Sequence, residues 1–142
     1  MSIKQISVFL ENKKGRLLAV TKCLYENNIN IRALSVADTS DFGILRMIVD
    51  QPDLAYKALK NSGFTVRETD VIAIEIPDNP GGLHQALEVL EKGNVNLEYV
   101  YAFVDARKDA ALNVIRVDKM EEATEILQKG GIKIITNEDL YI

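Results

Sequence analysis

An internal repeat constrains this chain more than any other feature of its sequence. Moving the second half back by 66 residues places Ile72–Val104 on Ile6–Asp38 without a gap. The identical residues there are Ile6, Gly15, Leu17, Leu24, Asn28 and Asn30, which meet Ile72, Gly81, Leu83, Leu90, Asn94 and Asn96. With an offset of 68, Val49, Asp50, Ala55, Leu59 and Gly63 then meet Val117, Asp118, Ala123, Leu127 and Gly131. The repeat predicts two similar domains, residues 1–70 and 71–142.

Both halves show the same succession of hydrophobic periods. Apolar residues alternate in Ile6–Leu10 and in Ile72–Ile76, which predicts a strand in each half. From Leu17 and again from Leu83, apolar or small residues recur at i, i+3, i+4 and i+7, which predicts a helix with one buried stripe. Two β-rich runs, a second helix and a short last strand follow. Their ranges are 31–38, 43–50, 52–63 and 65–68 in the first half, and 97–104, 111–118, 119–131 and 132–136 in the second.

The order strand, helix, strand, strand, helix, strand is that of the ferredoxin-like split βαβ unit. Residues 39–42 and 105–109 are expected to form the hairpins. About 70 residues make a small independent core, so the two units should pack together. Residues 97–104 carry a single charge and would promote aggregation if they formed an unpaired edge strand. We therefore predict an α+β fold in which the runs 31–38 and 97–104 pair side by side, giving one eight-stranded antiparallel sheet with helices on one face.

Composition argues against several classes of protein. The formal net charge is −4 and no basic cluster exceeds Lys13–Lys14, which argues against nucleic acid as a partner. No run is apolar for long enough to cross a bilayer, so no membrane partner is expected. The single cysteine, Cys23, cannot form an internal disulfide, which favours a cytoplasmic location. One histidine and one cysteine leave too few ligands for a typical zinc site, and no cofactor or metal is expected.

The loop between the first strand and the first helix is the main candidate for function. It reads ENKKGRL in the first half and PDNPGGL in the second, with Asn12 or Asp78 three residues before Gly15 or Gly81. Free amides at a helix start attract a carboxylate. A neighbouring amide or carboxylate oxygen accepts hydrogen bonds from an ammonium group. The combination suits a free amino acid, although a helix cap followed by a tight turn explains either loop alone equally well.

The loop, the helix that follows it, and then NINI or NVNL resemble the ACT domain, a regulatory module that binds amino acids. The resemblance covers nearly the whole chain, twice. It implies that the ligand lies between two modules whose second strands pair, touching the loop of one module and the start of the second strand of the other. The departures are Leu10 and Ile76, where some members place a polar contact, and Lys14, where proline is usual. The expected ligand-binding residues are Asn12, Gly15, Arg16, Leu17, Asn30, Asp78, Asn79, Gly81, Gly82, Leu83 and Asn96.

We therefore predict a non-catalytic sensor or regulatory protein that binds a free amino acid between two ACT-like modules. The alternatives are a ligand-free structural or dimerisation module and a regulatory subunit of a separate enzyme of amino-acid metabolism. Homodimerisation is left open. An acylphosphatase-like enzyme would need Arg16 as its loop arginine, but the matching residue is Gly82 and no nucleophile with a base accompanies it. We interpret His84 as a solvated helix residue and Cys23 as a small core residue.

Overall fold

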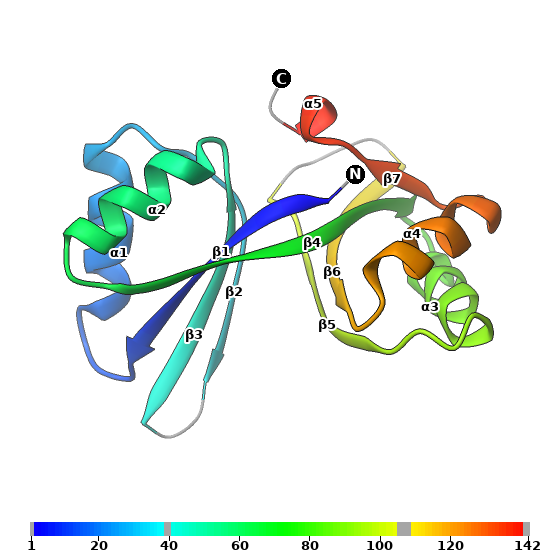
Figure 1. Cartoon of the computed structure of the whole chain (residues 1–142), viewed down its shortest axis with the longest axis horizontal. Helices are drawn as coiled ribbons and strands as arrows, with labels where there is room; N and C mark the ends of the chain where they lie inside the picture. Colours follow the sequence, from blue (N-terminus) through cyan, green and yellow to red (C-terminus); the bar gives the residue numbers. More distant parts are fainter. Residues whose placement is uncertain (1, 39–40, 105–108, 141–142) are drawn as a thin grey trace. The chain divides into compact units, whose positions relative to one another are not determined.

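The structure is a computed structural model that describes residues 2–38, 41–104 and 109–140 (Figure 1). It confirms the predicted alternation of strands and helices in both halves. The elements of the first half are β1 (Ile3–Glu11), α1 (Arg16–Glu26), β2 (Ile31–Asp38), β3 (Phe42–Val49), α2 (Pro52–Asn61) and the first part of β4 (Thr65–Pro77). The rest of β4 is followed by α3 (Gly82–Lys92), β5 (Leu97–Ala102), β6 (Ala110–Val117), α4 (Met120–Lys129), β7 (Lys133–Ile135) and α5 (Asn137–Leu140).

The chain forms two compact units. Lys4–Thr69 makes the first, and Asp70–Ile142 together with Met1–Ile3 makes the second. The border between them falls inside β4, so one strand ends the first unit and begins the second. The domain bounds 1–70 and 71–142, which rest on the repeat alone, stay a prediction.

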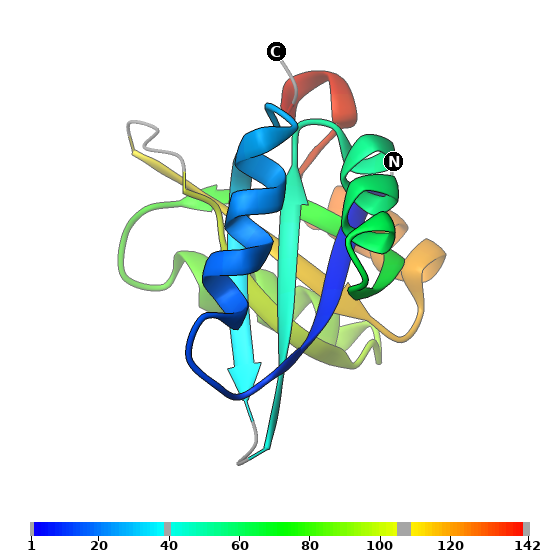
Figure 2. The same cartoon turned by 90° about the vertical axis from the view of Figure 1, so that its left-hand side faces the viewer.

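The sheet of the first unit runs in the order β2-β3-β1-β4. β1 and β3 are antiparallel, with Val8 opposite Leu45, and β2 pairs with the other edge of β3. Figure 2 shows α1 and α2 side by side in front of this sheet. Because side chains alternate along a strand, every second residue of β1 points toward the two helices.

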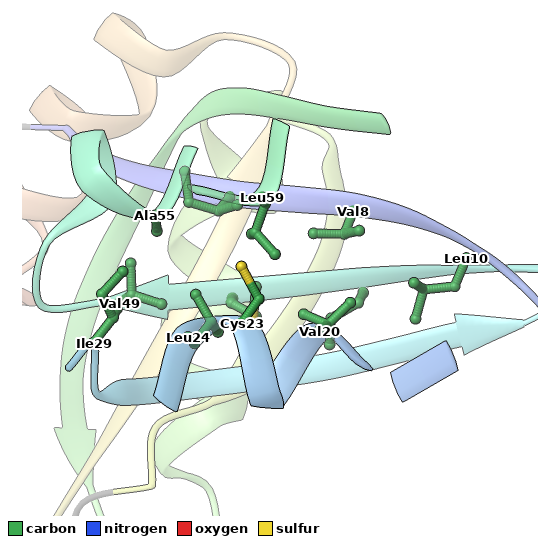
Figure 3. Packing of buried hydrophobic residues seen from close by; sticks show 12 residues of the cluster. Val8, Leu10, Val20, Cys23, Leu24, Ile29, Val49, Ala55 and Leu59 are labelled. Atoms are coloured by element: carbon green, nitrogen blue, oxygen red, sulfur yellow. The ribbon is translucent and has the colours of Figure 1, made fainter. Parts of the chain in front are cut away.

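The core of the first unit lies between that sheet face and the two helices (Figure 3). β1, α1 and α2 each contribute apolar residues to it. They include Ile6, Val8 and Leu10 from β1, Val20, Cys23 and Leu24 from α1, and Ala55 and Leu59 from α2. Fully burying a side chain such as Leu59 stabilises the fold by about 1.5–3 kcal/mol relative to leaving it exposed.

Left-handed asparagines end the first helix of each unit. Asn28 and Asn94 have φ values of 57° and 59°, and asparagine tolerates this region better than most residues do. The chain then turns back, and the amides of Ile29 and Val95 donate to carbonyls of Leu24 and Leu90 at 2.9 and 3.0 Å. The two matched asparagines of the repeat are therefore explained by backbone geometry.

The second unit repeats this arrangement. β5 pairs with β6, β6 pairs with β4, and β7 pairs with the other edge of β4. Its core is built from matching positions of β4, α3, β6 and α4, including Ile72, Ile74, Ala86, Leu90, Ile115, Ala123 and Leu127. α5 follows β7, has no counterpart among the described residues of the first half, and was not predicted from the sequence.

The expectation of eight strands was wrong. The described residues contain seven strands, because the last strand of the first half and the first strand of the second are the single strand β4. The predicted pairing of 31–38 with 97–104 is not shown. β2 pairs with β3 and β5 pairs with β6. β5 ends at Ala102, two residues before the end of the predicted run, and most of the two expected hairpin turns lies outside the described residues.

Candidate ligand-binding site

The predicted loops lead from β1 into α1 and from β4 into α3, and both use a left-handed glycine as the residue before the helix. Gly15 and Gly81 have φ values of 90° and 92°, and a side chain at either position would point into open space. No side chain caps the start of α1 or α3 within the described residues. The amides of Arg16 and Gly82, the first residues of α1 and α3, donate to the carbonyls of Lys13 and Asn79 at 3.4 and 3.1 Å. The next amides of the first turn have no acceptor one turn earlier in the helix, and they carry the partial positive charge of the helix start.

Main-chain bonds hold each loop against the neighbouring hairpin. The amide of Asn12 donates to the carbonyl of Asp41 at 2.9 Å, and the amide of Asp78 donates to the carbonyl of Asp109 at 3.1 Å. Both loop residues are exposed. The polar residue three positions before the glycine thus has a fixed backbone in both units.

The two loops differ at the residue that follows the left-handed glycine. In the second unit this residue is Gly82, where an added Cβ would collide with the carbonyl oxygen of Pro77 and lie 3.2 Å from its carbonyl carbon. In the first unit it is Arg16, whose guanidinium lies 5.5 Å from the ring centroid of Phe64. The second loop is therefore tighter than the first, and the amide of Gly82 donates to the carbonyl of Asn79 at 3.1 Å.

Asn30 and Asn96 lie at the opposite end of the first helix from the loop in each unit. α1 and α3 have 11 residues each, which corresponds to about 16 Å of helix. One unit alone therefore does not bring its loop and its asparagine together. Leu17 and Leu83 stay with the loops and are exposed in the first turn of each helix.

A reciprocal pair of hydrogen bonds holds each of these asparagines. The amide of Asn30 donates to Oδ1 of Asp50 at 3.0 Å, and the amide of Asp50 donates to the carbonyl of Asn30 at 3.1 Å. Asn96 and Asp118 make the same two bonds at 3.0 and 3.1 Å. No role was predicted for the two aspartates, although their identity in both halves was the signal for one.

We call each of these hydrogen-bonded pairs, Asn30 with Asp50 and Asn96 with Asp118, a clasp. A surface hollow opens beside the asparagine of each clasp. In the second unit it has a volume of about 510 Å³, and in the first about 340 Å³. Each lies between the end of the first helix, the start of the second strand and the aspartate of the clasp. Neither hollow was predicted, because a hollow depends on how side chains pack around it.

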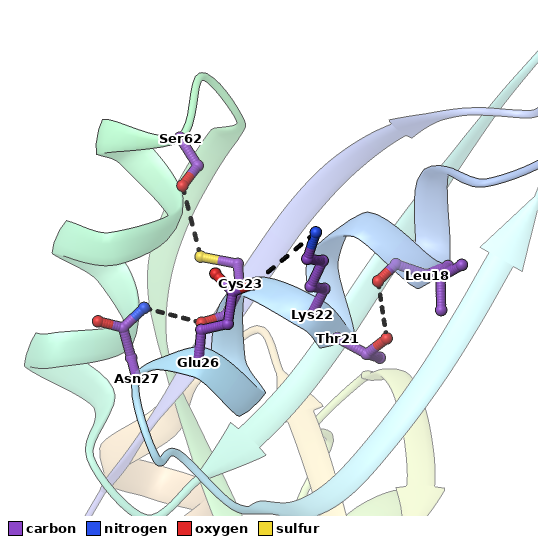
Figure 4. A network of polar contacts seen from close by, with 7 residues as sticks. All are labelled: Leu18, Thr21, Lys22, Cys23, Glu26, Asn27 and Ser62. Atoms are coloured by element: carbon purple, nitrogen blue, oxygen red, sulfur yellow. Dashed lines mark hydrogen bonds and ion pairs between the residues drawn. The ribbon is translucent and has the colours of Figure 1, made fainter.

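The cysteine and the histidine have structural surroundings. Cys23 is buried, and its Sγ lies 3.5 Å from Oγ of Ser62, linking α1 to the end of α2 (Figure 4). The amide group of Asn27 donates to the carbonyl of Cys23 at 2.8 Å and covers the end of α1. His84 is exposed, with Nε2 3.8 Å from Oε1 of Glu88 one turn away.

Within the described residues, no group of three or more histidine, cysteine, aspartate or glutamate side chains is placed to hold a metal ion. The helices described there include none that is long and apolar enough to cross a membrane.

Comparison with known proteins supports the family resemblance. The family model described as the ACT domain pair matches residues 1–142. Protein BT0572 from Bacteroides thetaiotaomicron is 45% identical with a TM-score of 0.93, and the match covers 99% of this chain and 96% of that one. The ligand-free regulatory subunit of aspartate kinase from Thermus thermophilus is similar in fold only, with 16% identity, a TM-score of 0.66 and coverage of 89% and 91%. No curated protein matches the chain.

Proposed function

Because this chain belongs to the ACT domain pair family, we propose that it is a non-catalytic regulatory protein that binds a free amino acid between two of its modules. The observation that carries the proposal is the retention, in both units, of an uncapped helix start behind a left-handed glycine with open space above it. The ligand carboxylate would bind the remaining amides in the first turn of α1 or α3, while the ammonium group would bind Asn12 or Asp78.

The second half of each site would come from the start of a second strand. Since the loop and the asparagine of one unit are about 16 Å apart along a helix, a complete site needs a loop from one unit and Asn30 or Asn96 from another. We propose that a β2 edge pairs with a β5 edge to bring them together. The apolar residues Leu34, Val36 and Val100 on these two strands are 40%, 47% and 36% exposed, which favours a covered edge.

Pairing within one chain and pairing between two copies differ in molecular mass. Light scattering of the purified protein would give a monomer in the first case and a homodimer in the second. Replacing Val36 or Val100 by lysine should weaken the pairing. Full retention of the assembly and of ligand binding in both lysine variants would contradict pairing through these edges.

A regulatory protein of this kind would act on a separate enzyme of amino-acid metabolism in the cytoplasm. The fold is similar to that of the regulatory subunit of aspartate kinase from Thermus flavus, at 16% identity and a TM-score of 0.63. The competing function is a structural or dimerisation module that needs no ligand.

Calorimetry with each of the twenty amino acids tests the proposal. The wild type should bind at least one of them. Gly15→Val and Gly81→Val should each remove one of two unequal sites, because a side chain would occupy the space above the helix start. Asn12→Ala should cost roughly 1–3 kcal/mol of binding at the first site through a lost polar partner.

Gly63→Val is the matched control for the two loop variants. Gly63 also has a φ of 90° with open space around it, but it lies at the end of α2 and not in a loop of the proposed site. This variant should lose as much stability as the loop variants and keep its ligand. If the wild type binds none of the twenty amino acids, the structural module is the function that remains.

A further inference from the structure

The two surface hollows occupy matching positions in the repeat. The hollow of the first unit is lined by Tyr25, Asn28, Ile29, Asn30 and Asp50. The matching residues Glu91, Asn94, Val95, Asn96 and Asp118 all line the hollow of the second unit. Both units therefore build the hollow from the same positions. Any difference in what the two hollows bind must come from the lining residues that differ between the two halves.

One such difference is the side chain on the helix wall. Tyr25 stands on α1 in the first hollow, whereas Glu91 stands at the same place on α3 in the second. Asp118 adds a second carboxylate, whose Oδ1 is fixed by the amide of Asn96 at 3.0 Å. The negative end of the α3 dipole lies at the same end of the helix. All three features favour a cation.

A second difference shows that the larger hollow already accommodates an ammonium group. Nζ of Lys119 donates to the carbonyl of Asn94 at 3.3 Å. In the first unit the matching group is the neutral amide of Gln51, which donates to the carbonyl of Asn28 at 3.1 Å. The acceptor is retained while the donor has become charged.

The remaining wall of the larger hollow is apolar. Leu87, Leu90 and Leu97 line it from α3 and the start of β5. An aliphatic stem that ends in an amine matches this combination of apolar wall and carboxylates, because the stem is covered while the charge meets Glu91 and Asp118.

We propose that the hollow beside Asn96 makes the site to which Asn96 contributes selective for an amino acid whose side chain ends in an amine, while the Tyr25 hollow gives the site of Asn30 no such selectivity. The proposal rests on the proposed function, since it places the ligand beside Asn96. It assigns Glu91 and Lys119 as opposing determinants: Glu91 attracts the side-chain amine, and the ammonium group of Lys119, which donates to the carbonyl of Asn94, repels it.

Calorimetry with L-lysine and L-norleucine tests this selectivity, because the two differ in the terminal amine but share the aliphatic stem. The wild type should bind L-lysine roughly three- to tenfold more tightly than L-norleucine, the gain expected for a partly exposed charge-assisted contact. Glu91→Tyr, which installs the residue of the first hollow, should remove that preference. Lys119→Gln, the reciprocal swap, should strengthen L-lysine binding several-fold and leave L-norleucine unchanged.

Glu88→Gln is the control for charge, since Glu88 is exposed on the same helix and does not line the hollow. It should leave the preference for L-lysine intact. Glu91→Gln removes the same charge without adding a ring to α3, and it should also remove the preference. If the wild type binds other amino acids but binds L-lysine no more tightly than L-norleucine, the selectivity is overturned and the proposed function stands. A wild type that binds no amino acid at all would overturn both.

Discussion

The loops that lead into α1 and α3 share one backbone turn but differ in the residue that follows it. Both place a glycine at a φ near 90° before the helix. The next residue is Gly82 in one loop, pressed against the Pro77 carbonyl, and Arg16 in the other, with its guanidinium over the Phe64 ring. The repeat has thus kept the geometry that exposes the helix amides and changed what surrounds it. Two sites built on these loops would share a way of holding the ligand and differ in how closely it approaches.

Placing alanine at the two matched positions should give the largest contrast between the loops. Gly82→Ala should lower the free energy of unfolding by roughly 1–3 kcal/mol, because the new Cβ collides with backbone. Arg16→Ala should cost less, about 0.5–1 kcal/mol for the lost contact with Phe64. Urea denaturation of both variants measures the difference. Equal losses would show that the loops are packed alike.

A smaller and equal effect is expected at the two clasps, where the units are the same. Asp50→Ala and Asp118→Ala each remove one hydrogen bond to a strand-opening amide, which should cost about 1 kcal/mol of unfolding free energy. Both asparagines should also become more mobile, which amide hydrogen exchange at residues 30 and 96 would report. Loss of protection in only one variant would mean that the second clasp does not hold its strand.

The smallest effect concerns a contact found in one copy only. Lys129 donates to Glu125 at 2.8 Å, and this bond, followed by the attraction of the two charges, lowers the pKa of the Glu125 carboxyl. The matching positions in the first half are Asn61 and Lys57, which form no such pair of opposite charges. Since the folded-state pKa is lowered, the pair stabilises the fold above the ordinary glutamate pKa, and this contribution is lost as the pH falls through the lowered value.

Lys129→Met should therefore raise the pKa of Glu125 toward its ordinary value, as followed by NMR titration of the side-chain carboxyl carbon. Lys92→Met makes the same substitution on α3 and should leave the titration of Glu125 unchanged. A Glu125 titration that is the same in wild type and Lys129→Met would show that the pair does not persist in solution.

Local patterns were sufficient to predict the strands, the helices and the repeat of this fold. Residues such as Val8, Leu24 and Leu90 recur at the periods of their elements and are buried as expected. The continuity of β4 was not predicted, because Glu68, Thr69 and Asp70 have the polar character of a linker and the sequence gives no sign of their backbone pairing. α5 was also missed, since four residues are too few for a helical period.

The candidate site was predictable in one respect only. Gly15 and Gly81 were identified from the repeat, and the structure gives both a conformation that favours glycine. Their binding role, and that of the other predicted ligand residues, stays a prediction. The clasps of Asp50 and Asp118 depend on residues 20 and 22 positions away, and no local pattern reports such a contact.

The continuity of β4 also limits how the junction between the two copies can change in evolution. A flexible linker gains or loses residues freely, but successive side chains of a strand point to opposite faces. A single residue inserted near Asp70 would turn Ile72, Ile74 and Ile76 out of the second core unless a bulge absorbed it. Insertions of one residue should therefore be rejected where insertions of two are tolerated. The length of this junction can then change only in steps of two residues, a restriction that does not apply to a flexible loop.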